Sequence, residues 1–364
     1  MKTKLSHSQV SRYSLCGQAF KYHYVDRIRP TTQSAALCFG TALDDALNVL
    51  VTNSGNPEQK FIDSFTKQHV NGSVTYLPTC VDLVYAESDY DAELITDEDK
   101  DVIDAAMEGG TISKVLNPFT HYDELRKKKK ENGFANLKTD EKCFYNYLNW
   151  LSLMRKGLLM LQAYRKKVLA KIQKVHAVQK YVELENETGD KIIGYVDMVA
   201  DLEGHGTVII DHKTSAMEYD EDAVLISPQL SLYMHILEQE YNTRKAGYIV
   251  LRKSVIKNRK KTCSVCGHDG TGGRHKTCDK EVAGKRCGGE WTEVIDPDIN
   301  IQIIIDEIPT LTEKVVIENY DETNKAIKSG VYPRNFSSCS NTYGGDCPYK
   351  ALCFKGSMKN LKKF

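Results

Sequence analysis

Asp197, Asp211 and Lys213 carry the side chains that metal-dependent phosphate chemistry needs, and they lie close together in the chain. Asp211 and Lys213 are two residues apart, so in a strand their side chains share one face. Carboxylate oxygens hold a hard divalent cation such as Mg²⁺ or Mn²⁺. The cation activates water and neutralises phosphate charge, while a lysine can orient the nucleophile or stabilise the charged intermediate. Because Asp and Lys are also common at strand ends, an ordinary hairpin with charged ends is the alternative.

The segments that must position these residues form a predicted β-hairpin. Apolar residues alternate from Ile192 to Val199, as in a strand with one buried face. Residues 203–206 include two glycines and favour a tight turn, and residues 207–211 are a short apolar run typical of a buried strand. The hairpin places Asp197 in the first strand and the other two candidates at the end of the second.

This arrangement resembles the core of the PD-(D/E)XK nuclease superfamily, with Asp197 as the first acid and Asp211, His212 and Lys213 as the D-x-K element. The resemblance implies an α/β fold with a restriction-endonuclease-like core, a small mixed β-sheet flanked by helices. It also implies that the two aspartates bind Mg²⁺ or Mn²⁺, that the His212 carbonyl assists as a metal ligand, and that Lys213 positions the attacking water.

Residues 227–233 resemble the Q-x-x-x-Y motif of the RecB-like branch of that superfamily. Gln229 and Tyr233 are four residues apart, so they are neighbours on one face of a predicted helix. The resemblance gives this pair one of two roles, to hold the substrate strand or to hold the active-site lysine.

A second helix is predicted near Phe39, and it resembles a G-x-x-x-H motif of the same branch, whose histidine is an additional metal ligand. Gly40 fits the motif, but Asp44 stands where the histidine would be. An aspartate is the harder donor and suits Mg²⁺ or Mn²⁺. We therefore expect Asp44 to be a metal ligand and Asp45 to lie on a solvated helix face.

Helical and strand periodicity outline the rest of the core. The predicted helices cover residues 6–28, 145–175, 220–241 and 300–329, and the strands outside the hairpin cover 178–185 and 245–255. Around the hairpin the order is α-β-β-β-α-β, which fits a small mixed sheet flanked by helices.

A cysteine-rich insertion is predicted at residues 256–295. Two thiolates in a Cys-x2-Cys knuckle can point at one metal, and two later thiolates complete a tetrahedral Zn²⁺ site. The candidate ligands are Cys263, Cys266, Cys278 and Cys287, with His268 and His275 as alternates. The segment has few apolar residues, so the metal would supply its folding energy. The segment opens with a basic stretch at residues 257–261, which favours nucleic acid over protein as the partner of this zinc-ribbon-like segment.

A second cysteine set joins the two ends of the chain: Cys16, Cys339, Cys347 and Cys353. It resembles the cluster of iron–sulfur nucleases of the RecB-like group, including AddB-type helicase-nucleases and the CRISPR-associated RecB-like exonucleases. The resemblance implies a [4Fe–4S] cluster held by these four thiolates. A second zinc site is the alternative. Cys38, Cys80 and Cys143 have no partner pattern and are expected to be buried apolar residues.

The chain has 364 residues and eleven cysteines, and its formal net charge is zero. No global field attracts it to nucleic acid, so DNA affinity must come from local patches such as the basic run at residues 126–130, which is equally compatible with a solvated loop. No run approaches a membrane span and no signal peptide is evident. We expect no membrane association and a cytoplasmic protein in a bacterial or phage-infected cell.

The predicted organisation is a nuclease core over residues 1–255 with a helical insertion at about 51–145, the zinc-ribbon-like insertion at 256–295, and a C-terminal region at 296–364. The C-terminal region would pack its helix and iron–sulfur cysteines against the N-terminal helix. The predicted function is a metal-dependent DNA exonuclease of recombination, repair or phage DNA processing, with DNA ends and recombination or replication proteins as partners. The alternative is a catalytically weak or inactive accessory protein that binds nucleic acid.

Overall fold

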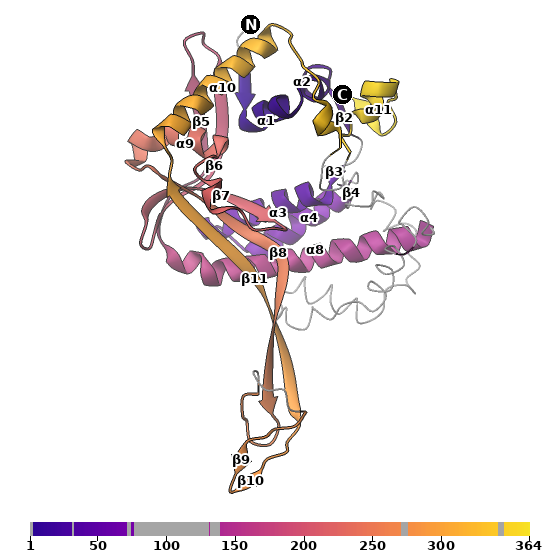
Figure 1. Cartoon of the computed structure of the whole chain (residues 1–364), viewed down its shortest axis with the longest axis vertical. Helices are drawn as coiled ribbons and strands as arrows, with labels where there is room; N and C mark the ends of the chain where they lie inside the picture. The colour runs from indigo at the N-terminus through magenta and orange to yellow at the C-terminus, as the bar shows by residue number, and fades with distance from the viewer. Residues whose placement is uncertain are drawn as a thin grey trace.

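A six-stranded mixed sheet forms the centre of the chain (Figure 1). The computed structural model describes residues 3–30, 33–70, 74–75, 131, 139–270, 276–340 and 346–364. The strands of the sheet are β1 (Lys4–Ser6), β5 (Ile172–Glu185), β6 (Lys191–Leu202), β7 (Gly206–Ser215), β8 (Lys245–Cys263) and β11 (Trp291–Glu307). β7 and β8 are parallel, whereas β5, β6 and β7 are antiparallel neighbours. The small mixed sheet flanked by helices that the sequence predicts is confirmed.

Strand β6 changes its partner along its length. It pairs with β5 along one edge, and along the other it pairs with β1 over residues 191–193 and with β7 over residues 198–202. Residues 194–197 lie between these two ladders, so β6 and β7 diverge just where Asp197 is reached. Such a divergence leaves room for side chains between the two strands.

Helices cover both faces of the sheet because its central strands alternate apolar side chains to either side. On one face α3 (Ala35–Thr52), α4 (Pro57–Val70) and α8 (Thr139–Lys167) pack over residues such as Met198 and Ile210. On the other face α1 (His7–Leu15), α9 (Pro228–Tyr241) and α10 (Thr310–Lys328) pack over residues such as Val199 and Ile209. Val208, Ile209 and Ile210 are all fully buried, as expected for a strand covered on both faces.

The helix predicted over residues 6–28 is broken. Ser6 caps α1, whose last turn is followed by Cys16 in an extended conformation (φ −166°, ψ 111°). The chain then continues through α2 (Gly17–Phe20), a π-helical turn η1 (Lys21–Val25) and strand β2 (Ile28–Pro30). A Cβ on Gly17 would lie 2.6 Å from Pro333, so the break lets the C-terminal region approach the backbone closely.

The predicted bounds of three helices are wrong for identifiable reasons. Residues 300–307 belong to β11, because the β-branched isoleucines there pack on alternate faces, and the helix begins at Thr310 after Pro309. The helix predicted to reach residue 175 ends at Lys167, and a 3₁₀ turn η5 (Leu169–Lys171) leads into β5. The helix predicted from 220 begins at Pro228, after a 3₁₀ turn η6 (Glu221–Ala223), because Ser227 caps it by accepting from the Leu230 N–H.

Strands β8 and β11 extend far beyond the sheet as a two-stranded arm (Figure 1). β8 pairs with β7 as far as Arg252 and with β11 along nearly its whole length. The strand predicted to end at residue 255 therefore continues to Cys263, and the insertion is the end of a long hairpin. The tip carries β9 (Glu281–Val282) and β10 (Lys285–Arg286).

The C-terminal region returns to the N-terminal elements. It contains a 3₁₀ turn η7 (Phe336–Cys339), α11 (Lys350–Lys355) and β12 (Leu361–Lys363), and β12 pairs with β2. The Tyr13 hydroxyl donates to the Val331 carbonyl at 2.6 Å. A further short pair joins β3 (Gln33–Ser34) to β4 (Val74–Thr75).

Among the described residues, one helix is long and apolar enough to cross a membrane by length and composition alone, contrary to the expectation that no segment is. This helix is α3, with a mean hydropathy of 1.3 over its 18 residues. Its apolar side chains, including Phe39, Leu43 and Leu47, belong to the core beneath the sheet. The hydropathy of α3 is therefore explained by packing against α4, α8 and the sheet.

Candidate active site and cysteine clusters

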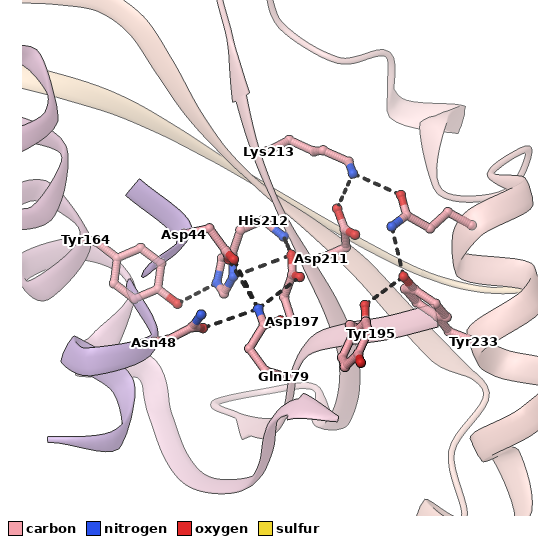
Figure 2. A network of polar contacts seen from close by, with 11 residues as sticks. Asp44, Asn48, Tyr164, Gln179, Tyr195, Asp197, Asp211, His212, Lys213 and Tyr233 are labelled. Carbon is pink, nitrogen blue, oxygen red and sulfur yellow. Dashed lines mark hydrogen bonds and ion pairs between the residues drawn. The ribbon is translucent and has the colours of Figure 1, made fainter. Parts of the chain in front are cut away.

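Asp197 lies in the gap between β6 and β7 (Figure 2). Its Oδ2 accepts a hydrogen bond from the backbone N–H of His212 at 2.8 Å. The carboxylate thus satisfies an N–H of β7 where the backbone ladder between β6 and β7 is interrupted. Asp211 is within β7 and only 1% exposed, which corrects the prediction that it stands at the strand end. The two carboxylates are near enough for their charges to interact.

Lys213 lies between a carboxylate and an amide. Its Nζ is 2.6 Å from Asp211 Oδ2 and donates to Gln229 Oε1 at 2.9 Å. The Gln229 amide nitrogen donates to the Tyr233 hydroxyl at 3.0 Å, and that hydroxyl donates to the Tyr195 carbonyl at 2.7 Å. Of the two roles predicted for Gln229 and Tyr233, these contacts favour holding the lysine.

Gly194 makes room for this chain of hydrogen bonds. A Cβ built on Gly194 would lie 2.7 Å from the Tyr233 ring, closer than side chains tolerate. The absence of a side chain at Gly194 thus allows α9 to bring Tyr233 against β6.

Asp44 reaches the same gap from α3. The Gln179 side-chain nitrogen, from β5, lies among oxygen acceptors of three residues. It is 3.2 Å from Asp44 Oδ2, 3.4 Å from Asp197 Oδ1 and 3.5 Å from Asn48 Oδ1. Gln179 has a positive φ of 49°, which is unusual for a residue within a strand. Asp45 points elsewhere and accepts from Ser64 at 2.7 Å.

Ligand atoms of Asp44, Asp197 and His212 all lie within 4.8 Å of one another. His212 enters this group through its side chain, although the resemblance had implied its carbonyl. Its Nε2 is 2.8 Å from the Tyr164 hydroxyl of α8, and its Nδ1 is 3.9 Å from Asp197 Oδ2. Asp211 is outside this group of three and pairs with Lys213.

Burial makes this cluster electrostatically costly. It raises the pKa of Asp44 to about 7, with a further contribution from Asp197, and it raises the pKa of Asp211 to about 6. The pKa of Asp197 is raised as well, mainly by burial. Burial opposes the charge on Lys213, but the Asp211 carboxylate outweighs it and raises the lysine pKa. A bound cation would remove the repulsion between the carboxylates, so the donor set fits a divalent metal.

The affinity of this site for Mn²⁺ is expected to rise between pH 5.5 and 8. A cation at this group must displace the proton from Asp44, whose pKa is about 7, and its charge also favours the ionised form of the neighbouring Asp211, whose pKa is about 6. Each displaced proton changes the apparent Kd by about tenfold per pH unit below the pKa. Electron paramagnetic resonance (EPR) titration of free Mn²⁺ at several pH values measures this slope.

Asp44→Asn is the matched control, because it removes one titrating group and should flatten the slope near pH 7. The same raised pKa values mean that the folded metal-free chain binds more protons than the unfolded chain between about pH 4 and 7. Its stability should therefore fall as the pH rises through that range. A Kd that stays constant with pH would contradict the protonation of these carboxylates.

The four cysteines of the arm tip converge. Cys263 and Cys287 have sulfur atoms 3.6 Å apart, as do Cys266 and Cys278, and all four sulfurs lie within 4.8 Å. Zinc–sulfur bonds of about 2.3 Å in a tetrahedron place sulfurs about 3.8 Å apart. Backbone N–H groups of Cys266 and Val265 lower the pKa of Cys263 to about 6, whereas burial raises the pKa of Cys278 to about 12, so without a metal the four thiols do not ionise together. His268 is not in the group, and His275 lies outside the described residues.

The second cysteine set surrounds a cavity. Cys16, Cys339, Cys347 and Cys353 all line a cavity of about 20 Å³ between α2, η7 and α11. Within the described parts of the chain, these four sulfurs do not come within 4.8 Å of one another as the arm cysteines do. A tetrahedral zinc site needs sulfurs about 3.8 Å apart, so these four residues would have to move closer together to hold one zinc ion.

The remaining cysteines and the basic run are not part of the sites described above. Cys38 is buried in the core, as predicted. Cys80, the side chain of Cys143 and the basic run at residues 126–130 lie outside the described residues.

A groove of about 920 Å³ connects the active-site lysine with the second cysteine set. Its lining is mixed: polar side chains such as Ser8, Ser11, Arg12, Lys213 and Gln229 stand beside apolar ones such as Leu15 and Pro348. The side chain of Lys213 is 31% exposed, so a ligand in the groove can reach it. Hydroxyl, guanidinium and ammonium donors are the groups that contact phosphate oxygens.

Sequence reasoning missed Asn48, Tyr164, Gln179 and Tyr195. Asn48 is four residues after Asp44, so helical spacing could have placed it beside that residue. The other three are brought in by tertiary contacts of α8, β5 and β6, and no local motif marks them.

Comparison with known proteins gives one clear result. The family model of the PD-(D/E)XK nuclease superfamily matches residues 4–354. Among solved structures, one titled "Crystal structure of SSO0001" is 15% identical and has a TM-score of 0.26, with 64% of this chain and 95% of that chain covered. No curated protein matches the sequence. Because the family model spans nearly the whole chain, including every residue of the site described above, this protein belongs to the PD-(D/E)XK nuclease superfamily.

Proposed function

We propose that the chain is a metal-dependent deoxyribonuclease that degrades DNA from an end. Members of its superfamily are typically metal-dependent nucleases. The observation that carries the proposal is the convergence of Asp44, Asp197, Asp211 and Lys213 from three elements on the gap between β6 and β7. Buried carboxylates with raised pKa values beside a lysine are costly in a purely structural role.

The chain's residues would divide the work of phosphodiester hydrolysis. Asp197 and Asp211, with Asp44, would hold Mg²⁺ or Mn²⁺, which when bound supplies charge neutralisation and a more acidic water. Lys213 would orient the attacking water or contact the phosphate, and Gln229 would keep its ammonium group in place. Tyr233 would in turn keep the Gln229 amide oriented.

The groove supports a nucleic-acid strand as the substrate. It opens on Lys213 and is lined by donors from α1 and from the region around Asn335. Degradation from a free end, and a role in recombination, repair or phage DNA processing, rest on the resemblance to the iron–sulfur RecB-like nucleases. Recombination or replication proteins are proposed partners on the same ground.

A nuclease assay tests the proposal. Wild-type protein with Mn²⁺ or Mg²⁺ is incubated with single-stranded and duplex DNA labelled at either end, and with covalently closed circles. An exonuclease should shorten linear DNA from one end and leave the circles intact, and EDTA should stop it. Cleavage of circles would replace exonuclease by endonuclease activity. DNA binding without cleavage under every metal would favour the alternative, an inactive accessory protein that binds nucleic acid. Its only support in the sequence is Asp44, which stands where the related nucleases have a histidine.

One zinc ion per chain is expected at the arm tip, bound by Cys263, Cys266, Cys278 and Cys287. Their sulfur separations match a tetrahedral zinc site. Cys278→Ser should lower bound zinc from about one equivalent to below one tenth and weaken DNA binding, because the tip loses its fold. Elemental analysis by mass spectrometry measures the metal.

Cys38→Ala is the matched control, because Cys38 is a buried cysteine of the core that belongs to neither set. It should keep the full zinc content. Equal zinc in Cys278→Ser and wild type would show that these four residues are not the ligands.

A further inference from the structure

His212 is buried in an unusual way. Its side chain is 4% exposed, and one ring nitrogen, Nε2, is 2.8 Å from the Tyr164 hydroxyl. The other, Nδ1, is buried and makes no hydrogen bond, because the nearest carboxylate oxygen, on Asp197, is 3.9 Å away. A buried nitrogen without a partner is costly unless something else satisfies it.

The surroundings of Nδ1 are those of a cation site. Ligand atoms of Asp44, Asp197 and His212 lie within 4.8 Å of one another. A cation about 2.1 Å from each donor would place the donors up to about 4.2 Å apart, so a small closure of the group completes the site. The two carboxylates already converge on one positively polarised atom, the Gln179 side-chain nitrogen, at 3.2 and 3.4 Å.

We propose that the imidazole of His212 is itself a metal ligand, binding through Nδ1, and that Tyr164 is the positioning residue that holds the ring. A metal on Nδ1 requires the tautomer with a hydrogen on Nε2, and that N–H then donates to the Tyr164 oxygen. Histidine ligands commonly donate their second N–H in this way, which fixes the ring. The inference deepens the proposed function and rests on its metal site.

The donor set has a chemical consequence. Two carboxylates are hard oxygen donors, whereas the imidazole nitrogen is a softer donor. Nitrogen donors suit transition metals better than they suit Mg²⁺. The site formed by Asp44, Asp197 and His212 should therefore bind Mn²⁺ more tightly than Mg²⁺. On binding, the Gln179 amide would be displaced from between the carboxylates.

The test measures Mn²⁺ binding without DNA. Wild-type protein labelled with ¹⁵N only in histidine is loaded with Mn²⁺, and pulsed EPR detects nitrogen bound directly to the metal. A ¹⁵N coupling is expected in wild type and should vanish in His212→Gln. Tyr164→Phe should keep the coupling but weaken the Mn²⁺ affinity by about tenfold, as for lost hydrogen-bond partners of other metal-bound histidines.

His176→Gln is the matched control, because its ring bonds Asp201 at 2.8 Å at a separate place on the sheet. It should leave both coupling and affinity unchanged. Bound Mn²⁺ without a ¹⁵N coupling in wild type, or with the coupling retained in His212→Gln, would overturn the inference while leaving the nuclease proposal standing. A protein that shows the coupling but cleaves no DNA would support the inference and overturn the nuclease proposal.

Discussion

Lys213→Met is expected to slow DNA cleavage by about 10²- to 10³-fold, the usual loss when one preorganised electrostatic group is removed from an active site. Lys213 lines the groove together with Arg12, and Asp211 and Gln229 fix the position of its ammonium group. Methionine keeps most of the length of the side chain, so the packing around β7 should survive. The single-turnover rate on end-labelled DNA with saturating Mn²⁺ measures the effect.

Lys245→Met is the matched control. Lys245 begins the neighbouring strand β8, and its ammonium group donates to the His205 carbonyl at 3.0 Å on the surface. Its replacement should change the rate less than twofold. If Lys213→Met cleaved DNA as fast as wild type while its circular dichroism was unchanged, Lys213 would have no part in the chemistry.

Cys16→Ser is expected to remove an iron–sulfur cluster and to lower the thermal stability. Protein purified without oxygen should be brown and should carry about four irons and four sulfides per chain if the cluster forms. Cys16 lies between α1 and α2, whereas the other three cysteines follow residue 338, so the cluster would close a loop over nearly the whole chain. Closing a loop of 100 residues or more stabilises a fold by about 4–5 kcal/mol.

Loss of the cluster should remove the absorbance near the blue end of the visible spectrum, where thiolate-bound iron absorbs. It should also lower the Tm. Cys38→Ala should stay brown. Cleavage by Cys16→Ser should fall in parallel with the folded fraction, because hydrolysis moves no electrons. A colourless anaerobic wild type with two zinc ions per chain would replace the cluster by a second zinc site and leave the nuclease proposal untouched.

The hairpin and the residues upon it were predictable because they are local. Alternating apolar residues fixed which face of β6 is buried, and the two-residue spacing of Asp211 and Lys213 placed both on one face of β7. The four-residue spacing of Gln229 and Tyr233 likewise placed them together on α9, where they form one hydrogen-bonded pair.

The rest depends on contacts between distant segments. Gln179 and Tyr164 reach the site because β5 and α8 pack beside it, and their own neighbours in sequence carry no signal of this. Residues 300–307 looked helical because isoleucines at adjacent positions satisfy either period, and their pairing with β8 decides for the strand. The burial of Asp211 could not be read from a motif either, since it arises from helices on both faces of the sheet.

The arm formed by β8 and β11 extends the molecule well beyond its central sheet. Beyond Arg252, where β8 leaves β7, the strand continues to Cys263, and those roughly eleven residues span about 36 Å. One turn of duplex DNA is about 34–36 Å long, or about ten base pairs. A duplex held both by the groove at Lys213 and by the arm tip would therefore be protected for about one further turn beyond the cleaved bond, a footprint wider than the nuclease core alone could produce.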